Sequence, residues 1–176
     1  MLFRSLGNPN DFDAIGRIIG GRDIDLIEDN CESLGATFGG RQTGTFGVMG
    51  SYSFFFSHHM STMEGGMVVT DDEEHYHFLL AIRAHGWTRN LPANNHVCRT
   101  RSDDPFEESF RFVVPGYNLR PTEVNAAIGL HQLAKLPGFI RARRDNARLF
   151  RERLAGHPRS EEHTSELQSH LNLVCR

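Results

Sequence analysis

The sequence predicts an α/β fold, in which helices alternate with apolar strands and pack on a sheet. Three observations support this class. Segments with an apolar stripe and capping residues predict helices, short apolar runs between them predict buried strands, and glycine-rich turns separate the two kinds of element. With 176 residues, of which 39% are hydrophobic and 23% charged, the chain is long enough for one hydrophobic core.

The first half of the chain supplies most of the predicted sheet. Asp11 and Asp13 favour the start of a helix, and Gly20 with Gly21 ends it. A strand then leads into the acidic residues Glu28 and Asp29, and a glycine-rich stretch over residues 35–50 separates it from two further apolar runs. The predicted elements are a helix over residues 10–20 and strands over residues 24–27, 51–56 and 66–70.

The second half is predicted to be mainly helical. Asp71 and Asp72 cap a helix that runs to about Ala84. Residues 87–115 are polar and without a clear period, and a loop of that length is usually functional or disordered. Proline favours the first turn of a helix. Pro121 is therefore predicted to open a helix to about residue 136, and Pro137 a second, strongly basic helix to about residue 154.

Composition argues against several functions. The net charge of −3 provides no basic footprint for nucleic acid or anionic lipid. No apolar run approaches the ~20 residues of a membrane span, and the N-terminal residues do not resemble a secretion signal. Three cysteines at wide spacings fit reduced thiols better than a disulfide framework or a zinc site. We therefore expect a cytoplasmic protein that binds neither nucleic acid nor membrane.

Residues 159–176 do not continue the preceding pattern. They resemble the conceptual translation of a short-read sequencing adapter, so we expect a non-native tail and exclude it from the fold. A short amphipathic helix is the alternative interpretation.

An acid at the end of a predicted strand is the first candidate for chemistry. Asp29 follows the strand directly and precedes a glycine-rich turn. Ligands of parallel α/β sheets lie outside the carboxyl ends of the strands, where an acid can hold a protonated ring nitrogen. From this segment alone, a helix or turn cap is the favoured interpretation.

A pair of histidines follows the next strand. His58 and His59 lie in a polar turn that returns through Gly65 and Gly66 to another strand. Histidine titrates near neutral pH and suits general acid–base catalysis. Paired histidines can also bind a metal, here with Glu64 as a third ligand, or have a structural role only. We expect no metal, because no further ligand stands at a motif spacing.

Several ordered motifs together are similar to the DegT/DnrJ/EryC1/StrS family of sugar aminotransferases, which act on nucleotide-linked keto sugars with pyridoxal phosphate. The resemblance covers residues 6 to about 155, and the matching motifs are the strand-end acid, the Ser-Phe strand 53–54, the strand 64–70, the segment 116–123 and the helix 126–130. It implies a three-layer α/β/α sandwich of pyridoxal-phosphate fold type I. Residues 1–136 would be part of the cofactor-binding large domain, and residues 137–158 the first helix of the small domain.

The departure from the family pattern is His58, which stands where most members have the lysine that binds the cofactor covalently. The chain has a single lysine, Lys135, outside these motifs. Imidazole can move a proton but cannot form a stable imine with an aldehyde. The segments 56–60, 85–92, 106–110 and 114–118 resemble a small branch of the family, the nucleotide-sugar 3-dehydratases.

This branch implies removal of the C3 hydroxyl from a nucleotide-linked 4-keto-6-deoxy sugar in dideoxysugar and O-antigen biosynthesis. Pyridoxamine phosphate would take part, and glutamate would restore it from pyridoxal phosphate. The alternatives are a sugar aminotransferase whose lysine has changed, and an inactive fragment of either enzyme. The family's N-terminal part, with an aromatic that stacks on the cofactor and a phosphate-binding loop, is missing here, so we expect the chain alone to be inactive and poorly folded.

The resemblance also assigns roles by position. His58 would exchange protons with cofactor and sugar. Asp29 would pair with the pyridine nitrogen, Glu32 with the ring hydroxyl and Ser53 with the phosphate. Asn118 would reach the phosphate of the neighbouring subunit in a homodimer with shared sites.

Three further residues are candidates for substrate binding. His85, Arg89 and Arg120 would bind the nucleotide sugar or the glutamate carboxylate, with a surface salt bridge or core hydrogen bond as the alternative. A sister branch binds an iron–sulfur cluster through four cysteines. Cys31 resembles the first of them, but only Cys98 lies in the region of the others, so we expect no cluster.

Overall fold

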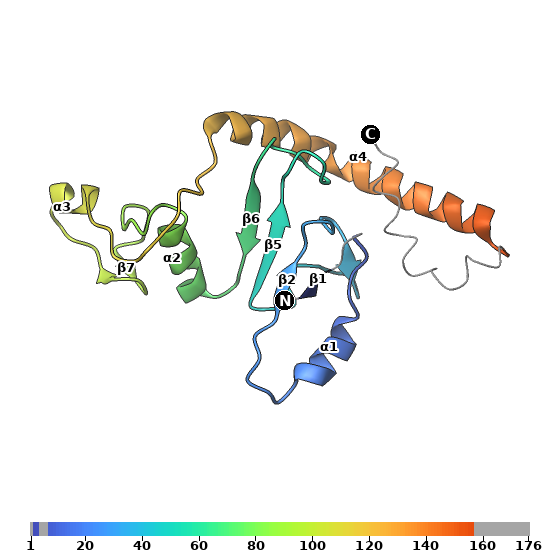
Figure 1. Cartoon of the computed structure of the whole chain (residues 1–176), viewed down its shortest axis with the longest axis horizontal. Coiled ribbons are helices and arrows are strands. Elements are labelled where there is room, and N and C mark those ends of the chain that lie inside the picture. Colours follow the sequence, from blue (N-terminus) through green and yellow to red (C-terminus); the bar gives the residue numbers. More distant parts are fainter. Residues whose placement is uncertain (1, 4–6, 157–176) are drawn as a thin grey trace. The chain divides into compact units, whose positions relative to one another are not determined.

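The computed structural model describes residues 2–3 and 7–156 (Figure 1), so the predicted tail over residues 159–176 lies outside the described residues. The chain divides into two compact units. The sheet unit contains the residues up to Val69 and those from Glu123 onward, and the insert unit contains Thr70–Thr122. Among the described residues, no helix combines the length and the apolar character that a bilayer crossing requires.

The sheet unit is built on four strands in the order β1-β2-β5-β6. The strands are β1 (Leu2–Phe3), β2 (Ile27–Asp29), β5 (Met49–Ser53) and β6 (Gly66–Val69). The first three are parallel, with Asp29 of β2 opposite Ser51 of β5, and β6 runs antiparallel to β5. The carboxyl ends of β2 and β5 therefore meet at one edge of the sheet, where ligands of such sheets bind.

Two strand predictions were displaced along the chain. The strand predicted over residues 24–27 lies at Ile27–Asp29, because the backbone of Glu28 and Asp29 pairs with β5 and their acidic side chains do not prevent it. The strand predicted over residues 51–56 lies at Met49–Ser53, and Phe56 is 65% exposed outside the sheet. The strand predicted over residues 66–70 is confirmed as β6.

Helix α1 (Phe12–Ile19) confirms the first predicted helix. The Asp11 side chain accepts a hydrogen bond from the Ala14 N–H at 2.9 Å and so caps the helix. The buried Phe12 ring stacks on Phe46 at 4.0 Å and meets the edge of Phe38 at 5.7 Å. These rings join α1 to the glycine-rich stretch, which forms the hairpin β3 (Thr37–Phe38) and β4 (Arg41–Gln42).

A buried carboxylate holds the rest of the glycine-rich stretch. Glu28 is 2% exposed, and its carboxylate accepts hydrogen bonds from the N–H groups of Gly44, Phe46 and Gly47 at 2.6, 2.5 and 2.8 Å. Gly44 has a φ of +89°, and a Cβ there would lie 2.2 Å from the hydroxyl of Tyr52. Glycine is therefore required at this position, and Glu28 connects the loop to the centre of the sheet.

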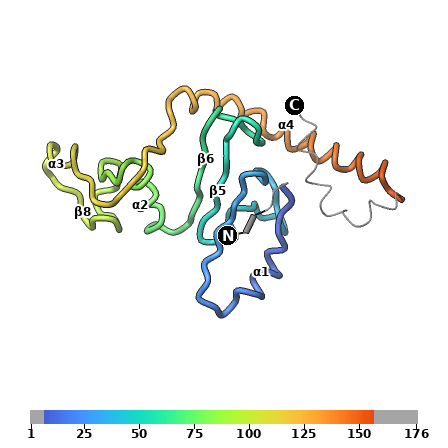
Figure 2. Tube along the Cα trace, in the orientation of Figure 1, coloured from blue at the N-terminus to red at the C-terminus, as the bar shows by residue number. Residues whose placement is uncertain are grey.

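Helix α4 (Glu123–Leu154) is a single helix of 32 residues with Pro137 in its interior, so the predicted break at Pro137 is wrong. Proline within a helix removes a hydrogen bond and costs ~3 kcal/mol. Packing on both sides of Pro137 offsets this. The Asn125 side chain donates to the carbonyl oxygens of Thr62 and Glu64, and Ile140 packs so close to Gly35 that a Cβ would lie 2.4 Å away. The β5–β6 connection thus lies against the first turns of α4 (Figure 2).

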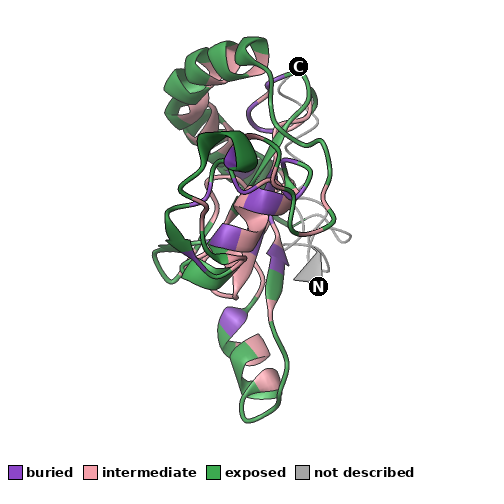
Figure 3. Ribbon diagram, turned by 90° about the vertical axis from the view of Figure 1, so that its left-hand side faces the viewer, coloured by how far each residue is buried: buried purple, intermediate pink, exposed green. Residues whose placement is uncertain are grey.

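The insert unit starts with helix α2 (Glu73–Ile82), which confirms the prediction of a helix capped by Asp72. The Asp72 carboxylate accepts a hydrogen bond from the His75 N–H at 2.8 Å. Ala81, Ala84, Thr88 and Leu91 are the most buried residues here, at 2% exposure or less. Figure 3 shows the buried residues of the described chain in purple. At Gly86, with a φ of +82°, a Cβ would lie 1.6 Å from the carbonyl oxygen of Val114, so the turn after α2 requires glycine.

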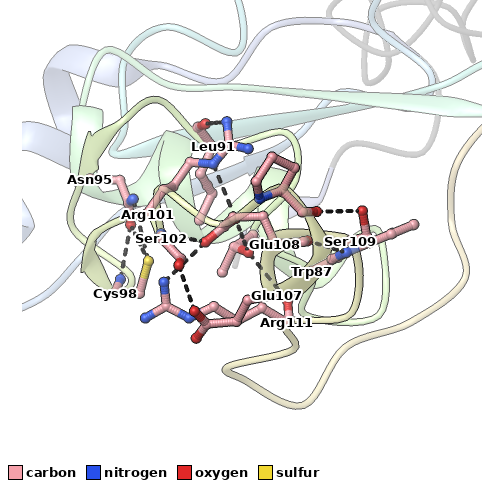
Figure 4. A network of polar contacts seen from close by, with 12 residues as sticks. Trp87, Leu91, Asn95, Cys98, Arg101, Ser102, Glu107, Glu108, Ser109 and Arg111 are labelled. Atoms are coloured by element: carbon pink, nitrogen blue, oxygen red, sulfur yellow. Dashed lines mark hydrogen bonds and ion pairs between the residues drawn. The ribbon is translucent and has the colours of Figure 1, made fainter.

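Residues 87–115 contain short ordered elements that were not predicted. They are the strands β7 (Asn94–Asn95) and β8 (Arg99–Thr100) and the helix α3 (Pro105–Ser109). Glu108, 5% exposed, lies at the centre of their polar contacts (Figure 4). Its carboxylate accepts from Thr88 at 2.7 Å and the Ser102 N–H at 2.7 Å, and it pairs with Arg101 and Arg111, each at 3.1 Å. These polar contacts hold together a segment that has few large buried apolar side chains.

The Glu108 network is expected to make the insert unit sensitive to acid. Burial alone would raise the pKa of Glu108, but hydrogen bonds from Ser102, Thr88, Arg111 and Arg101 lower it from 4.5 to about 2. As the pH falls through this window the unfolded chain binds the proton first, so the stabilisation present above pH 4.5 is lost by about pH 2.

Hydrogen exchange of the insert-unit amides in the complete protein, compared between wild type and Glu108→Gln, measures this effect. The variant should exchange faster at neutral pH, and its difference from wild type should shrink as the pH falls. Glu107→Gln, at the exposed neighbouring position, is the control and should keep the wild-type acid response. A Glu108→Gln difference that stays constant with pH would contradict the assignment.

Candidate active site

Two predicted site residues end neighbouring parallel strands. Asp29 is the last residue of β2 and Ser53 is the last residue of β5. Because β2 and β5 are parallel and paired, both side chains belong to the carboxyl edge of the sheet. Glu32 and His58 follow in the loops that leave these strands. The sheet unit therefore brings four of the predicted residues to one edge.

Asp29 is held by the turn that follows β2. Its Oδ1 accepts a hydrogen bond from the Cys31 N–H at 3.1 Å, and the thiol of Cys31 also hydrogen-bonds to this carboxylate. Burial, together with the hydrogen bond and charge of Asp29, raises the pKa of the Cys31 thiol to about 11. The thiol is therefore protonated at neutral pH and donates a hydrogen bond to Asp29.

His58 and Glu32 form a close pair. The Nε2 atom of His58 lies 3.1 Å from Oε1 of Glu32, and the two side chains are 17% and 27% exposed. The edge of the His58 ring also meets Phe55, with 5.7 Å between ring centroids. Two hydrogen bonds hold the turn that leads from β5 to His58. The Ser53 hydroxyl accepts from the Phe55 N–H at 3.2 Å, and the His58 N–H donates to the Phe55 carbonyl at 3.0 Å.

The adjacent His59 has a different environment. It is 8% exposed, and burial, with smaller contributions from the charges of Arg143 and His58, lowers its pKa to about 3. His59 is therefore neutral at working pH and poorly suited to proton transfer near neutrality. Among the described residues, no group of three or more His, Cys, Asp or Glu side chains could hold a metal ion. Of the two histidines, His58 is the candidate for acid–base work.

A cleft of about 410 Å³ in the sheet unit was not predicted from the sequence. Its wall combines loop residues near the carboxyl edge with basic side chains of α4: residues 7–9, residues 33–37, His59, Ile140, Arg143, Arg144, Ala147 and Arg151. The only sequence signal for it is the strongly basic composition of the second half of α4, which nothing in the sequence connects to the loops.

The insert unit carries the other four predicted residues, all of them exposed. Asn118 is opposite Ala84 in an antiparallel bridge, and the His85 N–H donates to the Tyr117 carbonyl at 2.8 Å. His85 and Asn118 thus lie on paired segments. The guanidinium of Arg89 lies over the Trp87 ring at 5.0 Å, and Arg120 follows Asn118 by two residues. Their roles in binding stay predictions.

The sheet-edge residues fit a pyridoxal-type cofactor that is not bound covalently. A carboxylate fixed at the end of β2 suits a protonated pyridine nitrogen, and the His58 imidazole in the loop after β5 offers a proton acceptor at the same edge of the sheet. Lys135, the single lysine of the chain, is exposed on α4. No lysine therefore stands at the predicted position for covalent attachment.

The parallel strands and the residues at their carboxyl edge define the class of protein: the chain has the fold of pyridoxal-phosphate enzymes of type I. It belongs to the DegT/DnrJ/EryC1/StrS aminotransferase family, whose family model matches residues 1–175. The recognition made from the motifs is confirmed.

Individual relatives show which members of the family the chain is similar to. The chain is 64% identical over 153 residues to the GDP-4-keto-6-deoxy-D-mannose 3-dehydratase of Yersinia pseudotuberculosis, covering 87% of this chain and 39% of that protein. The structure of the Escherichia coli GDP-4-keto-6-deoxy-D-mannose-3-dehydratase with bound hydrated PLP matches with a TM-score of 0.84 and 65% identity, covering 87% of this chain and 39% of that one. A GDP-4-keto-6-deoxymannose-3-dehydratase structure with a trapped PLP-glutamate geminal diamine matches with a TM-score of 0.84 and 64% identity over 87% and 40% of the two chains. The chain thus spans about two fifths of the length of these relatives.

Proposed function

We propose that the complete protein containing this chain removes the C3 hydroxyl of GDP-4-keto-6-deoxy-D-mannose with pyridoxamine phosphate, and that glutamate restores this cofactor from pyridoxal phosphate. The reaction would serve dideoxysugar and O-antigen biosynthesis. Identity of 64% to a dehydratase of this specificity supports the substrate, and a relative that holds PLP with glutamate supports the amino donor. Pyridoxal phosphate has an aldehyde where pyridoxamine phosphate has an aminomethyl group, so glutamate supplies the amino group together with two electrons and leaves as 2-oxoglutarate.

The observation that carries the proposal is the imidazole of His58 at the position of the family lysine, paired with Glu32 at 3.1 Å. An aminotransferase needs an amine there to exchange the cofactor between protein and substrate. Imidazole lacks that reactivity but moves protons well near neutral pH. The site is therefore suited to a reaction in which the protein handles protons only.

Each edge residue has a defined task in this proposal. When bound, the cofactor supplies an amine that reacts with the C4 ketone and an electron sink that makes loss of the C3 hydroxyl possible. Asp29 holds the pyridine nitrogen in its protonated form. Glu32 contacts the ring hydroxyl, and Ser53 contacts the phosphate. His58 takes a proton from the carbon next to the cofactor ring and delivers one to the departing C3 hydroxyl.

Exposed residues of the insert unit would bind substrate and partner. We propose that His85, Arg89 and Arg120 bind the nucleotide sugar or the glutamate carboxylate, because a guanidinium fork matches a carboxylate. Asn118 would contact the phosphate in the neighbouring subunit of a homodimer. The proposed location is the cytoplasm. Only Cys98 lies in the region of the other three cluster ligands, which supports a site without an iron–sulfur cluster.

Product analysis tests the function. The complete protein, loaded with pyridoxamine phosphate and given GDP-4-keto-6-deoxymannose and glutamate, should yield a sugar that lacks the C3 hydroxyl and keeps the C4 ketone, as followed by NMR. A sugar that keeps the C3 hydroxyl and gains a C4 amine would establish the alternative aminotransferase. Absence of turnover by the folded, cofactor-loaded protein would contradict both the dehydratase and the aminotransferase. The chain of 176 residues alone is expected to be inactive.

A further inference from the structure

The contact between His58 and Glu32 joins two residues for which the family resemblance predicts separate partners. The resemblance directs Glu32 to the cofactor's ring hydroxyl and His58 to the neighbouring reacting carbon. In the structure the two side chains meet directly, at 3.1 Å between Oε1 and Nε2, from loops that follow two paired parallel strands.

The chemistry of the pair defines which nitrogen carries the proton. An ionised carboxylate only accepts hydrogen bonds, so the nitrogen facing it must be a donor. That nitrogen is Nε2. The other ring nitrogen, Nδ1, is buried and has no hydrogen-bond partner among the described residues. A proton on Nδ1 would be a buried donor without an acceptor, which costs about 1–3 kcal/mol. Both effects favour the neutral ring with its proton on Nε2.

Surrounding groups support the same orientation. His59, the nearest other imidazole, is neutral because burial lowers its pKa to about 3, so it does not repel a proton on His58. The Phe55 ring, at 5.7 Å between centroids, contacts the His58 ring from the side and limits its rotation. A flip of the imidazole would put the Cε1 carbon in the position of Nε2 and so break the contact with Glu32.

We propose that Glu32 is a positioning residue for His58: its carboxylate holds the neutral imidazole in the tautomer with the proton on Nε2, which leaves Nδ1 as the nitrogen able to accept a proton. This inference deepens the proposed function and rests on His58 as its acid–base group. The task is additional to the contact with the ring hydroxyl. The Glu32 carboxylate thereby orients the acid–base group.

Nitrogen NMR of the cofactor-free complete protein, labelled with ¹⁵N-histidine, tests the proposal without any turnover. The His58 signal is assigned by its loss in His58→Gln. In wild type the neutral His58 should show a protonated Nε2 and an unprotonated Nδ1. Glu32→Met, which keeps side-chain length but removes the acceptor, should give a mixture of the two tautomers. Glu32→Gln, whose amide oxygen can still accept, should restore the wild-type form in part.

Controls separate a positioning role from general damage. Glu64→Met changes an exposed glutamate in the same β5–β6 connection and should leave the His58 signal unchanged. A proton on Nδ1 in wild type, or a Glu32→Met spectrum identical to wild type, would overturn the proposal. Because the readout is cofactor-free, its failure leaves the deoxygenation assay unaffected. Conversely, an amino-sugar product would reject the function whatever the tautomer is.

Discussion

Replacing His58 with glutamine in the complete protein is expected to lower kcat for C3 deoxygenation by about 10²–10⁴-fold, the usual contribution of a positioned acid–base group. Glutamine has a similar length and can still hydrogen-bond to Glu32, but it cannot accept and return a proton. The KM for the nucleotide sugar should change little, because the lost interaction belongs to the transition state. Steady-state kinetics with saturating glutamate measure both parameters.

The matched control is His75→Gln. His75 lies in the insert unit on α2, where its Nδ1 is 3.3 Å from a carboxylate oxygen of Asp72, so it also pairs with an acid but is not a proposed site residue. Its variant should retain kcat within about twofold, since a change at a surface helix position leaves the acid–base chemistry intact. A His58→Gln protein with kcat close to that of wild type would remove His58 from the reaction.

Glu28→Ala is expected to have the largest effect on stability, a loss of about 3 kcal/mol in the free energy of unfolding. The carboxylate is 2% exposed and accepts from three backbone N–H groups of the glycine-rich loop. Removal of one acceptor therefore leaves three donors without a partner, each of which costs about 1–3 kcal/mol if it stays buried. Partial opening of the loop to water reduces the sum. Denaturant unfolding of the complete protein at neutral pH gives the value.

Two further variants define the origin of that loss. Glu28→Gln keeps the side-chain volume and one acceptor oxygen, which can still accept from Phe46 and Gly47, but it turns an amide N–H toward the N–H of Gly44, so part of the loss should remain. Glu64→Ala, at an exposed position of the same unit, should change the free energy of unfolding by less than about 0.5 kcal/mol. If Glu28→Ala were as stable as Glu64→Ala, the loop would not depend on the buried carboxylate.

Local signals in the sequence predicted the elements that depend on local interactions. Asp11 and Asp72 were identified as capping residues, and both accept backbone hydrogen bonds at the starts of α1 and α2. The strand boundaries shifted because backbone pairing with β5 decides where β2 lies, and this pairing is not visible in a hydrophobic pattern. Pro137 lies within α4 because contacts before and after it outweigh the local preference of proline.

The order in residues 87–115 also arises from contacts distant in sequence. Glu108 binds Thr88 from 20 residues away and Arg101 from seven, and no local periodicity marks these partners. The polar segment over residues 87–115 was predicted to be an irregular loop. Its ordered structure depends on the buried carboxylate of Glu108 and the two arginines that pair with it.

The candidate site was predictable in its components but not in their pairing. Asp29 and Ser53 end their strands at the expected edge. The contact of Glu32 with His58 depends on two loops that meet only in the fold, and the burial that separates His59 from His58 depends on the packing of α4. Sequence patterns report neither distance nor burial between such segments.

The fate of the glutamate nitrogen is the most direct test of the claim that histidine in place of lysine turns nitrogen transfer into oxygen removal. The complete protein is incubated with GDP-4-keto-6-deoxymannose and ¹⁵N-labelled glutamate, and the label is followed by NMR and mass spectrometry. We predict that the label is released as ammonia in amounts equal to the deoxygenated sugar, and that the sugar carries no ¹⁵N. Stoichiometric label in a 4-amino sugar would contradict it.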